Sequence, residues 1–244
     1  MLTGAAGIFA VGLTLGLLGA GGSAIALPVL VYIVGMDPHQ AVAFSLLLVG
    51  GVSAYGTFLH ARRGLVQWSA ALAFAPFGVA GAALGSSWSY LLSGRALLLM
   101  FSGLLAVIAI GMLLEKHAEV EARGARKWHW IAVAGFGIGV VTGLLGVGGG
   151  FVVVPAMVYC AGLAMRQALA TSLVVIALNS LAAFTRHAAQ RPPEWKLAVL
   201  LTACAAAGMT AGVFLSHRTE PARLKRGFAC LLLGLAAFMT WRNV

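Results

Sequence analysis

Two glycine-rich clusters interrupt long apolar runs at equivalent places in the chain. The first lies within GLTLGLLGAGGSAIALPVLVYIVG (residues 12–35), and the second within GVVTGLLGVGGGFVVVPAMVYCAG (residues 139–162). Three further apolar runs follow each cluster, and few charged residues interrupt them. A run of about 20 apolar residues crosses about 30 Å of hydrocarbon as a helix. The pattern therefore predicts membrane helices over residues 41–61, 68–92, 96–114, 168–189, 197–215 and 224–241.

A shift of 127 residues aligns the two clusters and the segments that follow them without a gap. We interpret the chain as an internal duplication, with membrane repeats over residues 1–115 and 128–244 and a charged linker over 116–127. Each repeat then contains four elements, the first of which is broken by glycines. The register pairs Gly19 with Gly146, Gly21 with Gly148, Gly22 with Gly149, Gln40 with Gln167, Ser45 with Ser172, Ser53 with Ser180 and His60 with His187.

The glycine-broken element permits two topologies. Helices over Gly4–Leu18 and Ala24–Gly35 measure about 22 and 18 Å at 1.5 Å per residue, too long together for one upright crossing. The element either breaks and tilts, or folds back as a re-entrant hairpin, which makes the two halves an inverted repeat. Folding back leaves both termini outside and collects one more basic residue on the cytoplasmic face, so the positive-inside rule favours it slightly. The basic residues of that face are Arg62, Arg63, Lys116, Arg123, Arg126, Lys127, Arg166, Arg218, Arg223, Lys225 and Arg226.

The composition fits a multi-pass membrane protein and narrows its chemistry. The chain is 61% hydrophobic and 9% charged, with a mean hydropathy of +0.98. Its net charge of +10 indicates orientation in the membrane and contact with anionic lipid rather than nucleic-acid binding. The three cysteines have no paired spacing, so we expect neither a disulfide nor a metal site, and no cofactor. All six acids lie at span ends or in loops, which disfavours cation transport.

The glycine clusters are the main candidate for a binding site. Non-helical backbone at membrane depth is tolerated only beside protein or a watery cavity. Free amides at the start of the following helix favour an anion, and nearby hydroxyl and amide side chains can donate to it. Two alternatives stay open, since glycines also allow close helix packing and hydroxyls also bond to their own helix. The predicted substrate-binding residues are Gly19, Gly21, Gly22, Ser23, Ser45, Gly146, Gly148, Gly149, Gly150, Thr171, Ser172 and Asn179.

Four further polar residues lie at the ends of predicted spans. Gln40 and Gln167 stand where the second span of each half begins, and His60 and His187 stand where it ends. We consider them as gating residues that contact the anion or exchange a proton. The alternative, a solvated residue at the membrane boundary, applies to both histidines.

The clusters GLLGAGGSAIALP and GLLGVGGGFVVVP, with ATSLVVIALNSLAAFTRH and HARRG, give the chain a resemblance to the sulfite exporter TauE/SafE family, also described as toluene-sulfonate uptake permeases. The resemblance covers nearly the whole chain and implies a multi-spanning inner-membrane protein that moves sulfite, sulfonates or other sulfur-containing anions. The first half departs from the pattern, because Phe44, Gly51 and Val52 replace the counterparts of Thr171, Leu178 and Asn179. The family pattern falls on Gly19, Gly21, Gly22, Pro28, Gly146, Gly148, Gly149, Pro155, Thr171, Ser172 and His187.

These observations lead us to expect an all-α, polytopic transporter that exports a small sulfur-containing anion by alternating access. Its expected partners are the anion and membrane lipids, and a homodimer is left open. Two other classes were considered. An intramembrane enzyme needs a nucleophile beside a base at membrane depth, and the spans offer only serines with histidines at their edges. A non-transporting scaffold explains the apolar content but not the duplicated glycine clusters.

Overall fold

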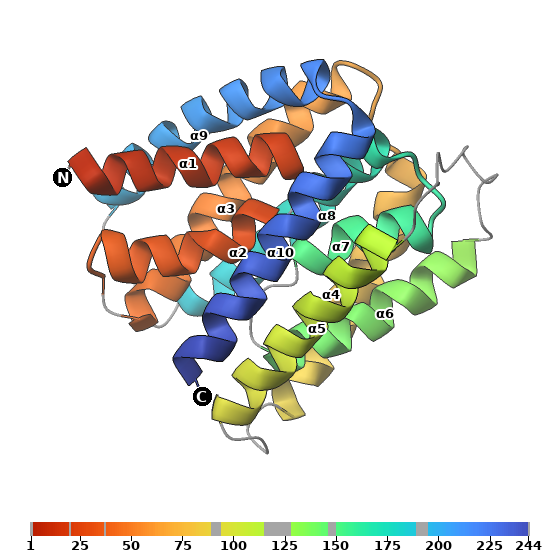
Figure 1. Ribbon diagram of the computed structural model, residues 1–244, viewed down its shortest axis with the longest axis horizontal. Coiled ribbons are helices and arrows are strands. Elements are labelled where there is room, and N and C mark those ends of the chain that lie inside the picture. Colours follow the sequence, from red (N-terminus) through yellow and green to blue (C-terminus); the bar gives the residue numbers. More distant parts are fainter. Residues whose placement is uncertain are drawn as a thin grey trace.

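The computed structural model describes residues 2–19, 21–36, 38–88, 94–114, 128–145, 150–188 and 195–243. Within these ranges every regular element is helical, which confirms the predicted fold class (Figure 1). The long helices begin and end within a few residues of the predicted spans. The elements are α1 (Leu2–Leu18), α2 (Gly21–Pro28), the π-helical segment η1 (Val29–Ile33), α3 (Pro38–Ala61), α4 (Trp68–Trp88), α5 (Gly94–Leu114), α6 (Trp128–Leu145), α7 (Gly150–Tyr159), α8 (Met165–Ala188), α9 (Trp195–Arg218) and α10 (Pro221–Asn243).

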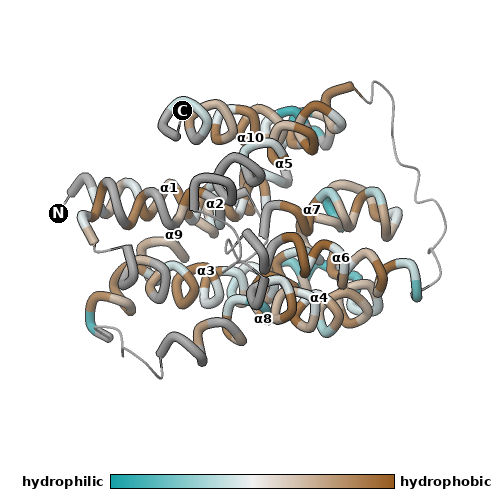
Figure 2. Tube along the Cα trace, turned by 90° about the horizontal axis from the view of Figure 1, so that it is seen from below, coloured by the Kyte–Doolittle hydropathy of each residue, from teal (hydrophilic) through white to brown (hydrophobic). Residues whose placement is uncertain are grey.

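The helices present apolar side chains both to one another and to the outside. In the part of the chain that the structure describes, four helices contain a stretch long and apolar enough to cross a membrane, namely Phe44–Ala61, Trp68–Gly85, Met165–Ala182 and Lys196–Ser216. Large apolar side chains point outward along the long helices, and Val107 on α5 and Val199 on α9 are 70% and 67% exposed. Figure 2 shows hydrophobic residues along the outer helices of the molecule. Such a surface is stable only against lipid, as expected for a multi-pass membrane protein.

The first glycine cluster folds the chain back on itself. A Cβ built on Gly22 would lie 2.6 Å from the backbone nitrogen of Leu15, two turns back along α1. Further along, a Cβ on Gly7 would lie 3.0 Å from Cγ1 of Val29. Helix α2 and η1 therefore run antiparallel to α1, and Gly19 occupies the turn with a φ of 64°. The chain therefore reverses at this element, as the fold-back interpretation predicts.

The segments that follow the two glycine clusters end in the same way. Gly35 and Gly162, equivalent under the shift of 127, both adopt a positive φ, of 80° and 68°. In each copy the next residue donates its amide to a carbonyl six residues back, from Met36 to Leu30 at 3.0 Å and from Leu163 to Met157 at 3.1 Å. Glycine in this left-handed conformation commonly ends a helix. The turn at Gly146–Gly149 lies outside the described residues.

The prolines act differently from one helix to another. Pro28 is the last residue of α2, and the chain continues as η1, where the amide of Val34 bonds to the carbonyl of Val29 at 3.0 Å. A proline lacks the amide that the α-helical ladder needs, so a wider turn here is a local adjustment. Pro76 lies inside α4, where we expect a mild kink, and the helix continues through it to Trp88.

Glycines join the two predicted halves through close helix pairs. Helix α1 packs along α9, and a Cβ on Gly208 would lie 2.9 Å from the backbone nitrogen of Leu13. Helix α4 packs along α6 in the same way, with a Cβ on Gly81 2.9 Å from the nitrogen of Val140. The helix-packing interpretation is correct for glycines in these pairs. Each pair takes one helix from residues 1–115 and one from 128–244, so each of the two hydrophobic clusters contains residues of both predicted repeats.

Helices α3 and α8 cross at the centre of the described structure. A Cβ on Gly50 would lie 3.2 Å from Cβ of Ser180, and one on Gly56 would lie 3.1 Å from Cδ1 of Leu173. Residue numbers thus increase along α3 while they decrease along α8, and the two helices run antiparallel. Figures 1 and 2 show α5 and α10, the last elements of the two predicted repeats, packed together along one side.

Candidate functional site

A small cavity lies where the ends of five helices meet. The end of α3 and the start of α8 form one side, and the ends of α1 and α9 with the start of α10 complete it. The space open to the centre of a water molecule is about 10 Å³, about enough for one water. This volume is too small for sulfite, so the cavity is closed in this conformation. Its lining residues are Gly16, Gly19, His60, Leu65, Arg166, Leu169, Ser216 and Leu224.

Gly19 brings the turn of the first hairpin to this cavity. Its φ of 64° is a conformation that side chains rarely allow. A Cβ here would also lie 3.3 Å from the carbonyl oxygen of Leu169 on α8. Gly16, one turn earlier, packs as closely on α9, where a Cβ would lie 2.8 Å from the nitrogen of Val213. This side of the cavity is therefore made of backbone, which larger residues would cover.

His60 lines the cavity from the last turn of α3. Its side chain is buried, with 4% of the residue exposed. Its carbonyl accepts hydrogen bonds from the amides of Arg63 at 3.1 Å and Leu65 at 3.2 Å. Gly64 ends the helix with a φ of 67°. The HARRG motif thus terminates α3 directly after a buried imidazole, so His60 is not the solvated boundary residue of the alternative interpretation.

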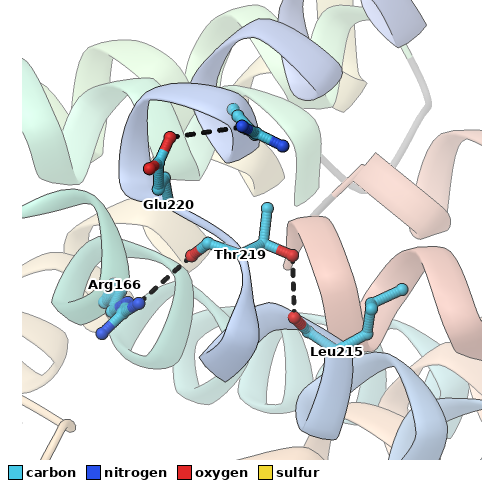
Figure 3. Close-up of polar contacts among 5 residues, drawn as sticks. Arg166, Leu215, Thr219 and Glu220 are labelled. Atoms are coloured by element: carbon cyan, nitrogen blue, oxygen red, sulfur yellow. Dashed lines mark hydrogen bonds and ion pairs between the residues drawn. The ribbon is translucent and has the colours of Figure 1, made fainter.

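Arg166 brings a guanidinium to the same cavity from the first turn of α8. Its Nη2 donates to the carbonyl oxygen of Thr219 at 3.1 Å, which ties α8 to the loop between α9 and α10 (Figure 3). The Thr219 hydroxyl donates to the carbonyl of Leu215 at 2.8 Å. Glu220 follows in the loop and pairs with Arg223 at 3.2 Å, both largely exposed. The sequence analysis treated Arg166 only as a boundary charge, although it directly precedes the predicted gating residue Gln167.

Several predicted hydroxyl donors bond within the protein. Ser172 Oγ donates to the carbonyl of Leu169 at 2.8 Å, in its own helix, as the alternative interpretation describes. Thr171 Oγ1 accepts the amide of Gln67 at 3.1 Å and so ties the start of α4 to α8. Both residues are fully buried. These bonds give them a structural role in this conformation.

The remaining predicted residues lie apart from the cavity or outside the described part. Ser23 and Ser45 are half-buried and do not line it, and Gly22 packs against α1. Asn179, on α8 beside the crossing with α3, has a buried Oδ1 without a hydrogen-bond partner among the described residues. Gly21 and Gly150 begin α2 and α7, and the half-buried Gln167 adjoins Arg166. Outside the described residues or side chains lie Gly146, Gly148, Gly149, Gln40 and His187.

The cavity lies at the basic end of the protein. Arg62 stands directly after α3, two residues past His60, Arg218 ends α9 two residues past Ser216, and Arg223 precedes Leu224 on α10. Two of these guanidinium groups lie over a phenylalanine ring four residues earlier in the chain, that of Arg62 at 5.6 Å and that of Arg218 at 4.3 Å. Stacking of this kind holds a cation at the edge of an apolar surface. No cluster of metal-binding side chains occurs in the described ranges.

The hairpin at the first glycine cluster, the interlocked apolar helices and the apolar side chains exposed on long helices together indicate the class of multi-pass helical membrane proteins. The family model described as "Sulfite exporter TauE/SafE" matches residues 4–239, and the chain belongs to this family. The family resemblance in the sequence is thereby confirmed.

Curated relatives agree with this class. A "Probable membrane transporter protein" of Xylella fastidiosa (strain 9a5c) is 32% identical over 240 residues, which cover 96% of this chain and 92% of the relative. A protein of the same description from strain Temecula1 is 33% identical over 244 residues, with the same coverage. The "Probable membrane transporter protein YdhB" of Bacillus subtilis (strain 168) is 25% identical and covers 69% of this chain and 71% of its own. No solved structure matches the chain.

Proposed function

We propose that this membrane transporter carries a small sulfur-containing oxyanion, sulfite or an organosulfonate, and that the cavity at Gly19, His60 and Arg166 binds it. The main support for this proposal is that the guanidinium of Arg166 and the buried imidazole of His60 line the same cavity. Among the described residues that line it there is no acid. A guanidinium donates in a planar fork that suits the oxygens of such an anion.

The hairpin supports the same ligand chemistry. Helix α2 begins at Gly21, two residues after the Gly19 turn that lines the cavity. The amides and the positive dipole end of a helix N-terminus favour negative charge. Together with Arg166 and His60, they make this end of the protein suited to an anion and unsuited to a cation.

The antiparallel packing of α3 and α8 supports an inverted repeat, and hence alternating access. These helices are equivalent under the shift of 127 residues, yet they run in opposite directions. Rocking of one half against the other would open the closed cavity. The two ends of such a carrier are chemically unequal here, because the sequence position equivalent to Arg166 is His39.

Charge distribution supports export from the cytoplasm across the inner membrane. The basic residues around the cavity favour a cytoplasmic position for this end of the protein under the positive-inside rule. An anion bound there leaves the cell along the inside-negative potential, which is worth about 2.3 kcal/mol per charge at 100 mV. Export therefore needs no coupling carboxylate within the spans.

Transport by the purified protein in liposomes tests this proposal. Vesicles loaded with sulfite, methanesulfonate or potassium are followed for efflux at a set membrane potential. We expect efflux of at least one of the two anions that accelerates when the loaded side is made negative, and no potassium efflux above that of empty vesicles. Anion efflux no faster than in protein-free vesicles would refute the proposal and favour a non-transporting scaffold. Potassium efflux without anion efflux would refute the assignment of an anion as the substrate.

A further inference from the structure

Two hydroxyl groups on α3 differ from most others in the described helices. Ser53 Oγ and Thr57 Oγ1 are buried and have no hydrogen-bond partner within the described part of the chain. Elsewhere, helical hydroxyls donate to a carbonyl three or four residues back, the ordinary arrangement for Ser and Thr in apolar helices. This arrangement occurs at Thr14, Ser172, Thr210, Ser216 and Thr240.

These two hydroxyls lie on the helix face that reaches the cavity. Ser53, Thr57 and His60 are spaced by four and then three residues, which places them one above another on α3. Ser53 is fully buried and lies about 10 Å along the helix axis from His60, at 1.5 Å per residue. It is also less than one turn from Gly50, which meets Ser180 where α3 and α8 cross. The stripe therefore leads from the cavity to the centre of the protein.

The hydroxyls make the closed conformation less stable. A buried donor without a partner destabilises the conformation that holds it, and an alanine at the same place would avoid that cost. Groups that destabilise one conformation often act in another. Asn179 on α8 presents a further buried side-chain oxygen without a partner among the described residues, one position from Ser180 at the same crossing.

A movable side chain fills the space beside the stripe. Gly56, next to Thr57, leaves room for the terminal methyl group of Met209, which occupies the place of a Cβ. Cδ1 of Leu173 lies 3.1 Å from that place. Methionine has a flexible, unbranched side chain that changes rotamer easily. Displacement of Met209 would make room beside Ser53 and Thr57 without moving backbone.

We propose that Ser53 and Thr57 form a second binding site for the transported anion, deeper in the protein than the cavity. Their hydroxyls donate to the oxygens of the anion after it leaves Arg166 and His60 and Met209 moves aside. The stripe thus lines the route from the cavity to the crossing of α3 and α8. This inference rests on the proposed anion transport.

The test compares transport by Ser53→Ala/Thr57→Val with that of the wild type and of Thr240→Val, whose hydroxyl bonds only to its own helix at 2.9 Å. We expect the double variant to lose at least tenfold in maximal anion flux while KM changes less than twofold, because the entry cavity stays intact. Its melting temperature should equal or exceed that of the wild type, and Thr240→Val should transport normally. Wild-type flux in the folded double variant would overturn the role of Ser53 and Thr57 in transport and would leave the proposed function standing.

A second variant keeps the inference testable if the double variant folds poorly. With the three native cysteines replaced by alanine, Ser53→Cys is treated with a small anionic thiosulfonate reagent under transport conditions. We expect modification that methanesulfonate slows several-fold. Absence of modification in actively transporting vesicles, or modification at the same rate with methanesulfonate present, would overturn the route. A wild type that transports no anion would instead refute the proposed function itself.

Discussion

Replacing Gly139 by alanine should force helices α4 and α6 apart. A Cβ at this position would lie 2.9 Å from the carbonyl carbon of Gly78 and 3.0 Å from the nitrogen of Ala82, well inside ordinary contact distance. Both atoms belong to the backbone of α4, so no side chain can turn aside to make room. In a close-packed interior the helices must separate by roughly 0.5–1 Å to admit the methyl group.

The cost of that separation can be estimated against a control on the same helix. Overpacking costs about 1–3 kcal/mol, and a contact made with backbone alone falls in the upper part of that range, at about 2–3 kcal/mol, while alanine offsets about 1 kcal/mol through its higher helix propensity. We therefore expect Gly139→Ala to lose roughly 1–2 kcal/mol. Gly137, two residues earlier, is exposed and has nothing within 4 Å of its Cβ position. Gly137→Ala should thus be neutral or gain up to about 1 kcal/mol.

Thermal unfolding of both variants in one detergent measures the difference. At about 2–4 °C per kcal/mol, Gly139→Ala should melt several degrees below the wild type. Gly137→Ala should melt at or slightly above it. A Gly139→Ala protein that melts with or above Gly137→Ala would show that α4 and α6 do not depend on glycine contact, and the packing argument would be wrong.

Three other predictions follow from local geometry. Gly162→Val should cost about 1–2 kcal/mol more than Gly162→Asn, since a branched residue tolerates the φ of 68° poorly, and chemical denaturation compares the two. Thr171→Val should cost about 1–3 kcal/mol by leaving the Gln67 amide without its acceptor, and an equal melting temperature in this variant would exclude that bond's contribution. Cysteines introduced at Arg63 and Arg223 should react with an impermeant thiol reagent only from the cytoplasmic side, and labelling from outside would reverse the proposed orientation.

The helices could be predicted because long apolar runs have few other options in a membrane. The predicted span 41–61 and the observed Pro38–Ala61 differ only at one end. The packing of helices from one half against helices of the other, as in α1 with α9 and α4 with α6, was not predicted. Apolar faces alone do not specify which helix packs against which. Only the spacing of glycines carries that information, as in Gly208 against α1 and Gly81 against α6. The π-helical turn at Val29–Ile33 depends on how the backbone adjusts to the amide hydrogen that Pro28 lacks. The apolar pattern of the sequence does not predict that adjustment.

The candidate site was predictable only in part. Gly19 and His60 stand out in the sequence because glycine clusters and histidines are unusual within membrane segments. Arg166 does not, because its part in the cavity depends on the loop at Thr219, which lies 53 residues away in the chain. Sequence equally cannot separate Ser172, which bonds to its own helix, from Ser53, which does not. Both belong to repeated serine pairs, and only the surrounding packing distinguishes them.

The most direct test of anion binding at the cavity is sulfite efflux from liposomes that contain Arg166→Gln or Arg218→Gln. Arg218 is an exposed guanidinium at the same end, stacked on Phe214 at 4.3 Å, and it does not line the cavity. We predict that Arg166→Gln lowers the efflux rate at subsaturating sulfite at least tenfold, whereas Arg218→Gln changes it less than twofold. Equal efflux from the two variants, with both proteins folded, would contradict the assignment of the site.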